Sequence, residues 1–487
     1  MQEKLQEFNF GIIARFLGFL LLIEAAFMAT ALIISFLDDT LKEGYLYHAV
    51  IATLAAGLFF FMLGSKANRA VGRRDAYLIV SLTWIVTSVF GAMPFYFSGY
   101  IPSYTNAYFE TISGFSTTGA SILTDIEALP RDLLFWRSLT HWLGGMGIIV
   151  LSVAVLPILG IGGMQLFMAE MPGVTYDKLH PRITETAKRL WGIYVILTIA
   201  QFLLLWAGEM DWFDSACHTF ATMATGGFST RNASIAAFGP YSQYIIIIFM
   251  ILAGTNFTLH YFALHGWFGK VWGNEEFRTY LFIIIICTLL IGTNLFLHNA
   301  GQPEPLLREV LFTVVSILTT TGFVTTDYLQ WPTFLWMVVV MLMFIGGSAG
   351  STGGGIKVIR QSLLLKNSFV EMRRAIHPAA VLPAKYNGKS VPQEIVYKVM
   401  AFFLVYILIF AAGVMVLTAM GIDFETSIGA SAACLGNIGP GIGKVGPVYH
   451  YAFLPDAAKW VLSLLMVLGR LELFTVLMLF SRHFWRK

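Results

Sequence analysis

Charge is scarce in this chain of 487 residues, of which only 12% are Asp, Glu, Lys or Arg. Soluble domains carry roughly 25% charged residues, so this composition excludes an ordinary soluble enzyme. The hydrophobic share of 57% and the mean hydropathy of +0.72 instead predict an all-α polytopic membrane protein. The net charge of +3 gives no indication of nucleic-acid binding, and none is expected.

Metal-ligand and disulfide patterns are also missing. The three cysteines, Cys217, Cys287 and Cys434, are widely spaced in apolar surroundings, where we interpret them as small buried hydrophobic residues. His260 and His265 lie five residues apart, whereas a shared helix face favours four. We therefore expect no bound cofactor and no metal site made of these side chains.

Long apolar runs are abundant, and ten of them approach the ~20 residues that a helix needs to cross a bilayer. They lie at about 11–37, 46–65, 75–99, 131–160, 187–208, 240–266, 278–298, 331–366, 395–420 and 457–482. An even number of spans places both termini on one side. With the termini inside, 23 of the 31 Lys and Arg residues fall on the cytoplasmic side and 7 outside, with Arg470 within a span. This asymmetry predicts cytoplasmic termini.

Four glycine motifs fall in the predicted outer connections, each after a short apolar segment of a dozen or so residues. They lie near 116–121, 224–228, 320–324 and 437–441, and the last departs most from the Thr-Thr-Gly pattern. Such a segment is too short to cross a membrane but long enough for a re-entrant helix. The irregular backbone of the glycine motif that follows it needs protein or water around it. The order of span, short helix, glycine motif and span therefore predicts four repeats around one pseudo-fourfold pore, after a leading helix pair.

The expected units are the leading pair at 1–70 and repeats at 71–160, 161–275, 276–380 and 381–487. Backbone carbonyls and hydroxyls of the motifs are expected to replace the water around a cation, as in a selectivity filter. The filter residues predicted are Thr117, Thr118, Gly119, Ala224, Thr225, Gly226, Thr320, Thr321, Gly322, Asn437, Ile438 and Gly439. One acid precedes each motif. These acids either form a negative outer vestibule that concentrates cations or are favoured at helix N-termini by the helix dipole. These acids are Glu110, Asp214, Glu309 and Glu425.

On these ordered motifs the chain resembles the Trk/Ktr/HKT superfamily of potassium transporters over essentially its whole length, most closely the membrane subunits of bacterial Trk uptake systems. The resemblance implies a K⁺ pathway in the bacterial inner membrane, a homodimer, and control by a cytosolic nucleotide-binding ring of the RCK type. Serine in the first motif goes with Na⁺ permeation in this superfamily, and the chain has Gly119 there. We expect K⁺ selectivity weaker than in tetrameric channels, with Rb⁺ accepted.

A glycine-rich stretch interrupts the eighth span, and at roughly 1 kcal/mol for each glycine it cannot stay helical cheaply. It contains Gly346, Gly347, Ser348, Ala349, Gly350, Ser351, Thr352, Gly353, Gly354 and Gly355. We expect two half-helices joined by a loop below the filter, and the resemblance implies that this loop is a gate. Arg470 is expensive in lipid, so it faces the interior or water, either as a barrier to cations beside the gate or in a structural pair with Glu472 or a carboxylate of a short helix.

Two other functions remain open from the sequence. A symporter driven by H⁺ or Na⁺ also contains broken helices, although its fold usually has two inverted halves rather than four parallel repeats. Gly346-Gly347-Ser348-Ala349-Gly350 matches the G-x-S-x-G pattern of a serine hydrolase, but it lies within an apolar span rather than at a strand-to-helix turn. Inside the cell, the basic segment from Lys357 to Lys398 and the segment 161–186 are candidate docking surfaces for a regulatory protein.

Overall fold

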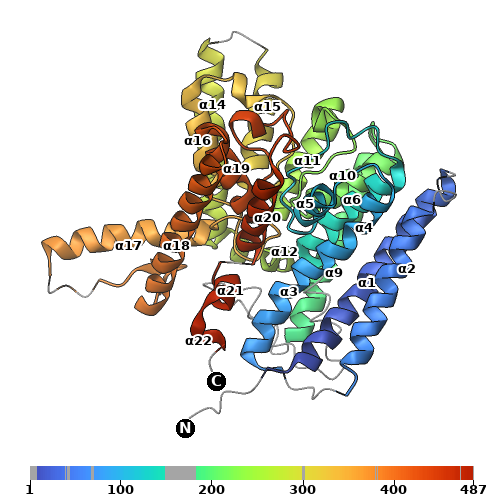
Figure 1. Cartoon of the computed structure of the whole chain (residues 1–487). Coiled ribbons are helices and arrows are strands. Elements are labelled where there is room, and N and C mark those ends of the chain that lie inside the picture. Colours follow the sequence, from blue (N-terminus) through green and yellow to red (C-terminus); the bar gives the residue numbers. More distant parts are fainter. Residues whose placement is uncertain are drawn as a thin grey trace.

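The computed structural model describes residues 8–485 apart from 39, 41–43, 67–70, 148–182, 299–301, 379, 381 and 472 (Figure 1). The segment 161–186, expected as a docking surface, lies almost entirely outside the described residues. In the described part the chain is helical almost throughout, which confirms the all-α prediction. Its strands form one hairpin, β1 (Lys385–Tyr386) and β2 (Lys389–Ser390).

A leading pair of long helices, α1 (Phe10–Leu37) and α2 (Tyr45–Leu63), lies at one side of the molecule (Figure 1). The two backbones approach closely because Gly18 of α1 faces the backbone of Gly57 and Phe61, and Gly64 faces the backbone of Gly11. The hydrophobic effect does not drive helices together in lipid, so close van der Waals packing at small residues stabilises such a crossing.

The rest of the chain repeats one order four times: a long helix, a short helix, a loop with a glycine motif, and a second helix. The long helices are α3 (Arg73–Gly91), continued by α4 (Met93–Phe97), then α9 (Ile183–Trp206), α14 (Glu275–His298) and α18 (Gln393–Ala419). The short helices are α5 (Tyr104–Phe115), α10 (Trp212–Met223), α15 (Pro303–Leu318) and α19 (Phe424–Gly436). The second helices are α6 (Arg131–Trp142), α11 (Pro240–Ala253), α16 (Thr333–Met343) and α20 (Asp456–Arg470).

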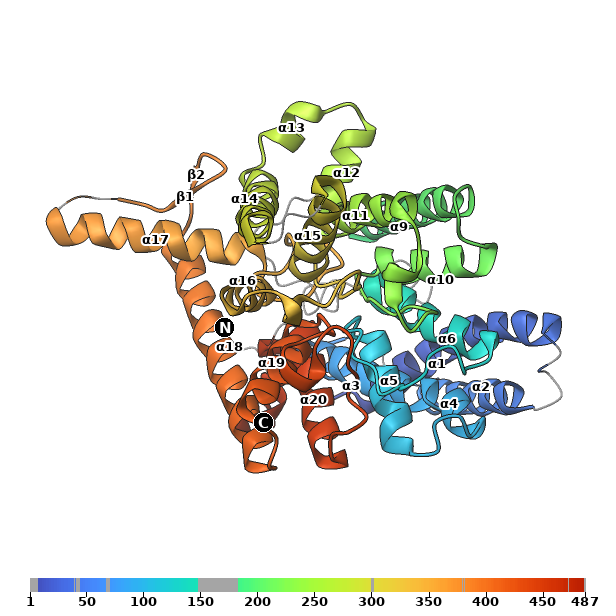
Figure 2. The same ribbon diagram turned by 90° about the horizontal axis from the view of Figure 1, so that it is seen from above.

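Seen from above, these groups follow one another around the molecule, and α19 and α20 return to the side of α3 and α5 (Figure 2). The short helices α5, α10 and α19 are deeply buried, each with a long run of buried residues. The chain therefore brings its four glycine motifs to the middle of the bundle.

The second helix of each repeat is interrupted at its C-terminal end, whereas the sequence predicts an interruption only for the eighth span. After α6 comes a π-helical turn, Leu143–Gly147. The helix pairs α11 and α12 (Phe257–Leu264), and α20 and α21 (Phe474–Leu477), bend by 102° and 113°. After α16 a loop leads to α17 (Val358–Ile376), which projects from the body (Figure 2). Gly144, Gly254, Gly346 and Gly469 lie at or beside these interruptions.

Because of the interruptions, six of the described helices are long and apolar enough to cross a membrane, or up to eight if each bent pair counts as one span. The ten continuous spans expected from apolar composition are thus partly broken into shorter helices. The remaining elements are short: α13 (Phe268–Trp272), α22 (Arg482–Trp485) and 3₁₀ turns at Ser234–Ala237, Tyr328–Gln330, Gly443–Val445 and Met478–Phe480.

The two ends of the described chain lie together. The Phe8 ring is 5.6 Å from the Phe484 ring and 5.2 Å from the Trp485 ring, measured between centroids. The ends therefore lie on the same side of the bundle, as an even number of crossings requires.

Candidate functional site

The four short helices end in the same hydrogen-bonded turn. Just beyond each helix one residue adopts a left-handed backbone, and the next N–H donates to the carbonyl five residues earlier, which is the Schellman motif. The left-handed residues are Thr117 (φ 54°), Thr225 (φ 54°), Thr320 (φ 59°) and Asn437 (φ 54°). The bonds run from Thr118 to Ser113 (2.9 Å), Gly226 to Ala221 (2.8 Å), Thr321 to Ser316 (2.8 Å) and Ile438 to Ala433 (2.9 Å).

This turn is costly for three of the four residues. A β-branched residue at positive φ is a genuine outlier, and such strain costs of order 1–3 kcal/mol per residue. The same outlier at Thr117, Thr225 and Thr320 identifies these turns as places where the backbone path matters more than local stability.

Two residues after each left-handed residue, a glycine at positive φ closes a ring between the four motif loops (116–121, 224–228, 320–324 and 437–441). These are Gly119 (φ 80°), Gly227 (φ 85°), Gly322 (φ 79°) and Gly439 (φ 96°). The residue between the left-handed residue and the glycine is the middle residue of each loop. A Cβ on each glycine would meet the carbonyl oxygen of the middle residue in the next loop, which is Gly226, Thr321, Ile438 and Thr118, in that order. The order runs from the first loop to the fourth and back to the first, so the four loops form a closed ring.

The ring fixes the correspondence between the loops, and in the second it differs by one residue from the expected Ala224–Gly226. The ring residues there are Thr225, Gly226 and Gly227, while Ala224 has right-handed helical geometry at the end of α10. Adjacent glycines leave two possible alignments in the sequence. The spacing Thr-x-Gly, common to Thr117–Gly119, Thr225–Gly227 and Thr320–Gly322, is the signal that selects the right one.

Hydroxyl and amide groups support the loops from behind. The Thr118 hydroxyl bonds the Ser116 hydroxyl (2.7 Å), and the Thr321 hydroxyl bonds the Thr319 hydroxyl (2.7 Å). On the far side of the ring, the Tyr451 hydroxyl donates to the Gly439 carbonyl (2.7 Å). Because these partners are buried and satisfied, the loops hold their carbonyls in a fixed arrangement of the kind that replaces the hydration of a cation.

The four acids before the motifs are not equivalent. Glu110 is buried, bonds the Arg137 guanidinium (2.7 Å) and accepts from the Ser121 hydroxyl and the Ile122 N–H. Asp214 accepts from the Arg231 guanidinium (2.6 Å) and the Thr230 hydroxyl. Both carboxylates thus hold the chain that follows their motif and have their charge balanced by arginine.

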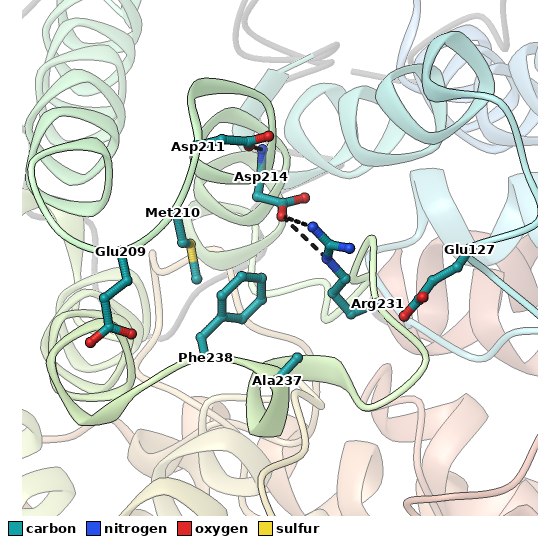
Figure 3. Close-up of a pocket in the computed structure, with 8 residues that line it drawn as sticks. All are labelled: Glu127, Glu209, Met210, Asp211, Asp214, Arg231, Ala237 and Phe238. Atoms are coloured by element: carbon teal, nitrogen blue, oxygen red, sulfur yellow. Dashed lines mark hydrogen bonds and ion pairs between the residues drawn. The ribbon is translucent and has the colours of Figure 1, made fainter.

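Figure 3 shows the Asp214–Arg231 pair at the edge of a pocket of about 490 Å³, with Glu127, Glu209, Asp211 and Phe238 around it. The other two acids are more open: Glu309 is half-buried in α15, and Glu425 is exposed in the first turn of α19. Beside Glu425, the Thr426 side chain bonds the Asp423 carboxyl and holds its pKa below the usual value. The N-terminal end of α19 therefore carries two exposed carboxylates, Glu425 and Asp423, and the Lys444 ammonium lies 3.6 Å from Asp423.

The loop that interrupts the eighth span (residues 345–356, the interrupting loop) lies directly beneath the motif loops. The Gly354 N–H donates to the Thr320 hydroxyl (2.8 Å), and a Cβ on Gly354 would meet the Gly436 carbonyl at 2.6 Å. On the second repeat, the Ser348 N–H donates to the Gly254 carbonyl (2.9 Å). On α14, the Glu276 carboxylate accepts from the Ala349 N–H (2.7 Å). The broken end of α11 thus supplies a carbonyl that an unbroken helix would use internally.

Arg470, at the end of α20, connects this loop to the first repeat. Its guanidinium donates to the carbonyls of Thr352 (2.6 Å), Gly144 (2.7 Å) and Gly145 (2.7 Å). Gly144 and Gly145 belong to the π-helical turn after α6, so the interrupting loop bonds groups of the second, third and fourth repeats directly and reaches the first repeat through Arg470. The expected alternative, a pair with Glu472, falls on a residue outside the described part.

The described residues contain no group of three or more His, Cys, Asp or Glu side chains placed to hold a metal ion. Within the same part of the chain, the Ser348 hydroxyl is buried and has no hydrogen-bond partner, so no histidine base activates it. The G-x-S-x-G pattern therefore lacks the geometry of a catalytic triad.

Comparisons with known proteins identify the family of this chain. The family model described as "TrkH: Cation transport protein" matches residues 45–300 and 302–487. The chain belongs to the TrkH family of cation transport proteins. Members of this family are transporters rather than enzymes, which removes the serine hydrolase left open by the sequence. Together with the apolar helices, the family identifies a multi-pass membrane protein.

Among the relatives, the Trk system potassium uptake protein TrkH of Escherichia coli strain K12 is 42% identical, covering 98% of this chain and 100% of that protein. The Trk system potassium uptake protein TrkG of the same strain is 37% identical over 88% of this chain and 90% of that protein. The crystal structure of the potassium transporter TrkH from Vibrio parahaemolyticus superposes with a TM-score of 0.88 at 39% identity, covering 98% of this chain and 100% of that one. The family predicted from the four motifs is thereby confirmed.

Proposed function

We propose that this protein takes up K⁺ across the bacterial inner membrane through a gated pore, and that the four motif loops are its selectivity filter. The closed ring of glycines and carbonyls carries the proposal. Four backbone segments with the same turn, the same φ pattern and mutual contact form a symmetric set of oxygen ligands, which suits a monovalent cation. The relatives named as potassium uptake proteins and potassium transporters favour K⁺, with Rb⁺ as its substitute.

The filter residues of this proposal are Thr117–Gly119, Thr225–Gly227, Thr320–Gly322 and Asn437–Gly439, with the earlier Ala224 replaced by Gly227. The units 1–70, 71–160, 161–275, 276–380 and 381–487 remain our division of the chain. Cytoplasmic termini are supported by the basic residues, 23 inside against 7 outside. The contact of Phe8 with Phe484 supports a location of both ends on the same side. Glu425, and more weakly Glu309, form the negative outer vestibule, because Glu110 and Asp214 are paired with arginines.

The interrupting loop and Arg470 form the gate. The loop's position beneath Thr320, its bonds to three repeats and its link through Arg470 to the first repeat support this role, because small displacements of the loop alter the passage below the filter. A cytosolic nucleotide-binding ring of the RCK type is the proposed regulator. The projecting α17, which continues directly from the loop, and the hairpin β1–β2 form its docking face on a homodimer of this chain.

The test is the reversal potential of the purified protein in a planar bilayer, with K⁺ on one side and Na⁺ on the other. Gly119→Ser is expected to move the potential away from the K⁺ Nernst value, because its side chain meets the Gly226 carbonyl. Gly99→Ser is the matched control: Gly99 also has positive φ (75°), but nothing lies within 4 Å of its Cβ position. If Gly119→Ser keeps the parent K⁺/Na⁺ ratio, the filter assignment is wrong.

If the bilayer recording shows no current, the same measurement is made on a variant with the interrupting loop shortened between Gly346 and Gly355. A closed channel then begins to conduct, whereas a carrier coupled to H⁺ or Na⁺ does not. Currents beyond carrier turnover support the pore, and their absence in the shortened variant supports coupled transport instead.

A further inference from the structure

The second motif loop differs from the other three in having no side chain at its middle position. Thr118 and Thr321 occupy this position in the first and third loops, with their hydroxyls bonded to Ser116 and Thr319. Ile438 occupies it in the fourth loop and is fully buried. In the second loop the residue is Gly226, which leaves the wall behind this part of the ring unfilled by its own loop.

Gly226 does not need to be glycine for its backbone conformation. Its φ lies outside the left-handed region, unlike that of Gly227. A side chain is excluded for another reason: a Cβ on Gly226 would overlap Nδ1, Cγ and Cε1 of His141. At the ring-closing glycines Gly119 and Gly227, by contrast, the obstacle is a backbone carbonyl of the next loop.

His141 reaches this place from α6, the second helix of the preceding repeat. The side chain is 0% exposed, and its ring centroid is 4.0 Å from that of Phe228. One turn earlier on α6, the Arg137 guanidinium lies 3.5 Å from the Phe228 centroid and donates to the Ser229 carbonyl (2.9 Å). The last two turns of α6 therefore form the wall behind the second motif loop.

Polar contacts do not explain the position of His141. Among the described residues neither ring nitrogen has a hydrogen-bond partner, and a buried polar group left unsatisfied is destabilising. The ring is surrounded by Phe228 and the Gly226 backbone, so its contribution there is its volume.

We propose that His141 supplies from α6 the side chain that the second filter loop lacks, and so acts as a positioning residue that determines ion preference. This inference rests on the proposed function of the motif loops. All four filter strands are then supported from behind: the first by Thr118, the second by His141, the third by Thr321 and the fourth by Ile438. Without the imidazole, the second strand gains room to move outward, and the fixed spacing of carbonyls that discriminates K⁺ from the smaller Na⁺ is lost at this position.

The experiment exchanges volume between the two residues in purified protein in proteoliposomes, with Rb⁺ and Na⁺ uptake as readouts. His141→Ala is expected to lower the Rb⁺/Na⁺ uptake ratio about tenfold, and Gly226→Val alone to lose uptake through the clash with the ring. The double variant His141→Ala with Gly226→Val is expected to return the ratio to within about threefold of the parent. Valine is chosen because the fourth loop carries the β-branched, apolar Ile438 at the same position.

Two controls separate volume from polarity and from general damage. His141→Leu keeps the volume without the ring nitrogens and is expected to retain the ion preference. His260→Ala removes an imidazole from α12, whose Nε2 bonds the Leu252 carbonyl, and is expected to leave the ratio unchanged.

If His141→Ala retains the parent ratio, or the double variant is no better than the single ones, the proposal is overturned. If His141→Ala does not give a folded protein on size-exclusion chromatography, the double variant must recover it; failure to recover also overturns the proposal. Gly119→Ser, measured in parallel, separates the two levels. An unchanged ratio there removes the filter assignment itself, whereas a lowered ratio there with no effect at His141 removes only this inference.

Discussion

Release of the interrupting loop by Arg470→Ala is the most direct test of the gate. Three carbonyls share this guanidinium, but only the bond to Thr352 (2.6 Å) ties the loop to α20. A hydrogen bond to a charged group contributes roughly 1.5–3 kcal/mol. With about 2 kcal/mol for the Thr352 bond, the substitution shifts the loop about thirtyfold toward release. Removal of the positive charge from the pathway acts in the same direction on cations.

The assay is radioactive Rb⁺ uptake into proteoliposomes, with the initial rate as the measured quantity. Arg470→Ala is expected to raise this rate by at least about tenfold. Arg470→Lys keeps the charge but not the fork that reaches three carbonyls, so its rate should lie between the two. Arg131→Ala removes a half-exposed arginine paired with Asp211 at 3.5 Å and serves as the matched control with an unchanged rate. An unchanged or lower rate in a well-folded Arg470→Ala protein would refute the reasoning.

The other predictions concern the acids. Glu276→Ala removes the acceptor of the Ala349 N–H and is expected to raise the Rb⁺ uptake rate about tenfold. Glu276→Gln keeps an acceptor and is expected to change the rate less. Equal rates in the parent and Glu276→Ala would contradict this prediction. Glu110→Gln leaves Arg137 buried without its counter-charge and is expected to cost about 3–5 kcal/mol of stability, measured as a lower thermal midpoint on size-exclusion chromatography. Glu425→Gln leaves the thermal midpoint unchanged and raises the Rb⁺ concentration for half-maximal uptake; the opposite pattern in the two variants would reverse their assigned roles.

The sequence predicted the elements whose signals are local. Apolar runs located the long helices, and the dense glycines between Ile345 and Ile356 located the interruption in the eighth span. The breaks after α11 and α20 were missed because each depends on a partner far away in the chain. Gly254 ends α11 where its carbonyl accepts from Ser348, and α20 ends where Arg470 reaches Gly144 and Gly145. No window of sequence contains both partners of such a bond.

The acids show the same limit. All four precede a glycine motif by similar spacing, so the sequence treats them as a set. Their surroundings then separate them: Arg137, which lies 27 residues after Glu110, and Arg231, 17 residues after Asp214, decide that these two carboxylates hold the chain. Glu425, in the first turn of α19, has no arginine partner among the described residues and stays exposed. Position before the motif indicates a helix, and only the tertiary partner indicates a role.

The fourth motif has the weakest sequence match, yet its departure from the pattern has a physical reason. The turn requires a left-handed residue, and Asn adopts that conformation at less cost than Thr. Asn437 also carries an amide: its Nδ2 donates to the Thr118 hydroxyl (3.0 Å) and to the Met466 carbonyl (2.9 Å). These bonds join the fourth loop to α20 and to the first loop, where the last motif of the chain meets the first. A threonine hydroxyl has a single hydrogen and cannot donate to both partners. The residue that weakens the motif in the sequence is therefore the one that closes the ring.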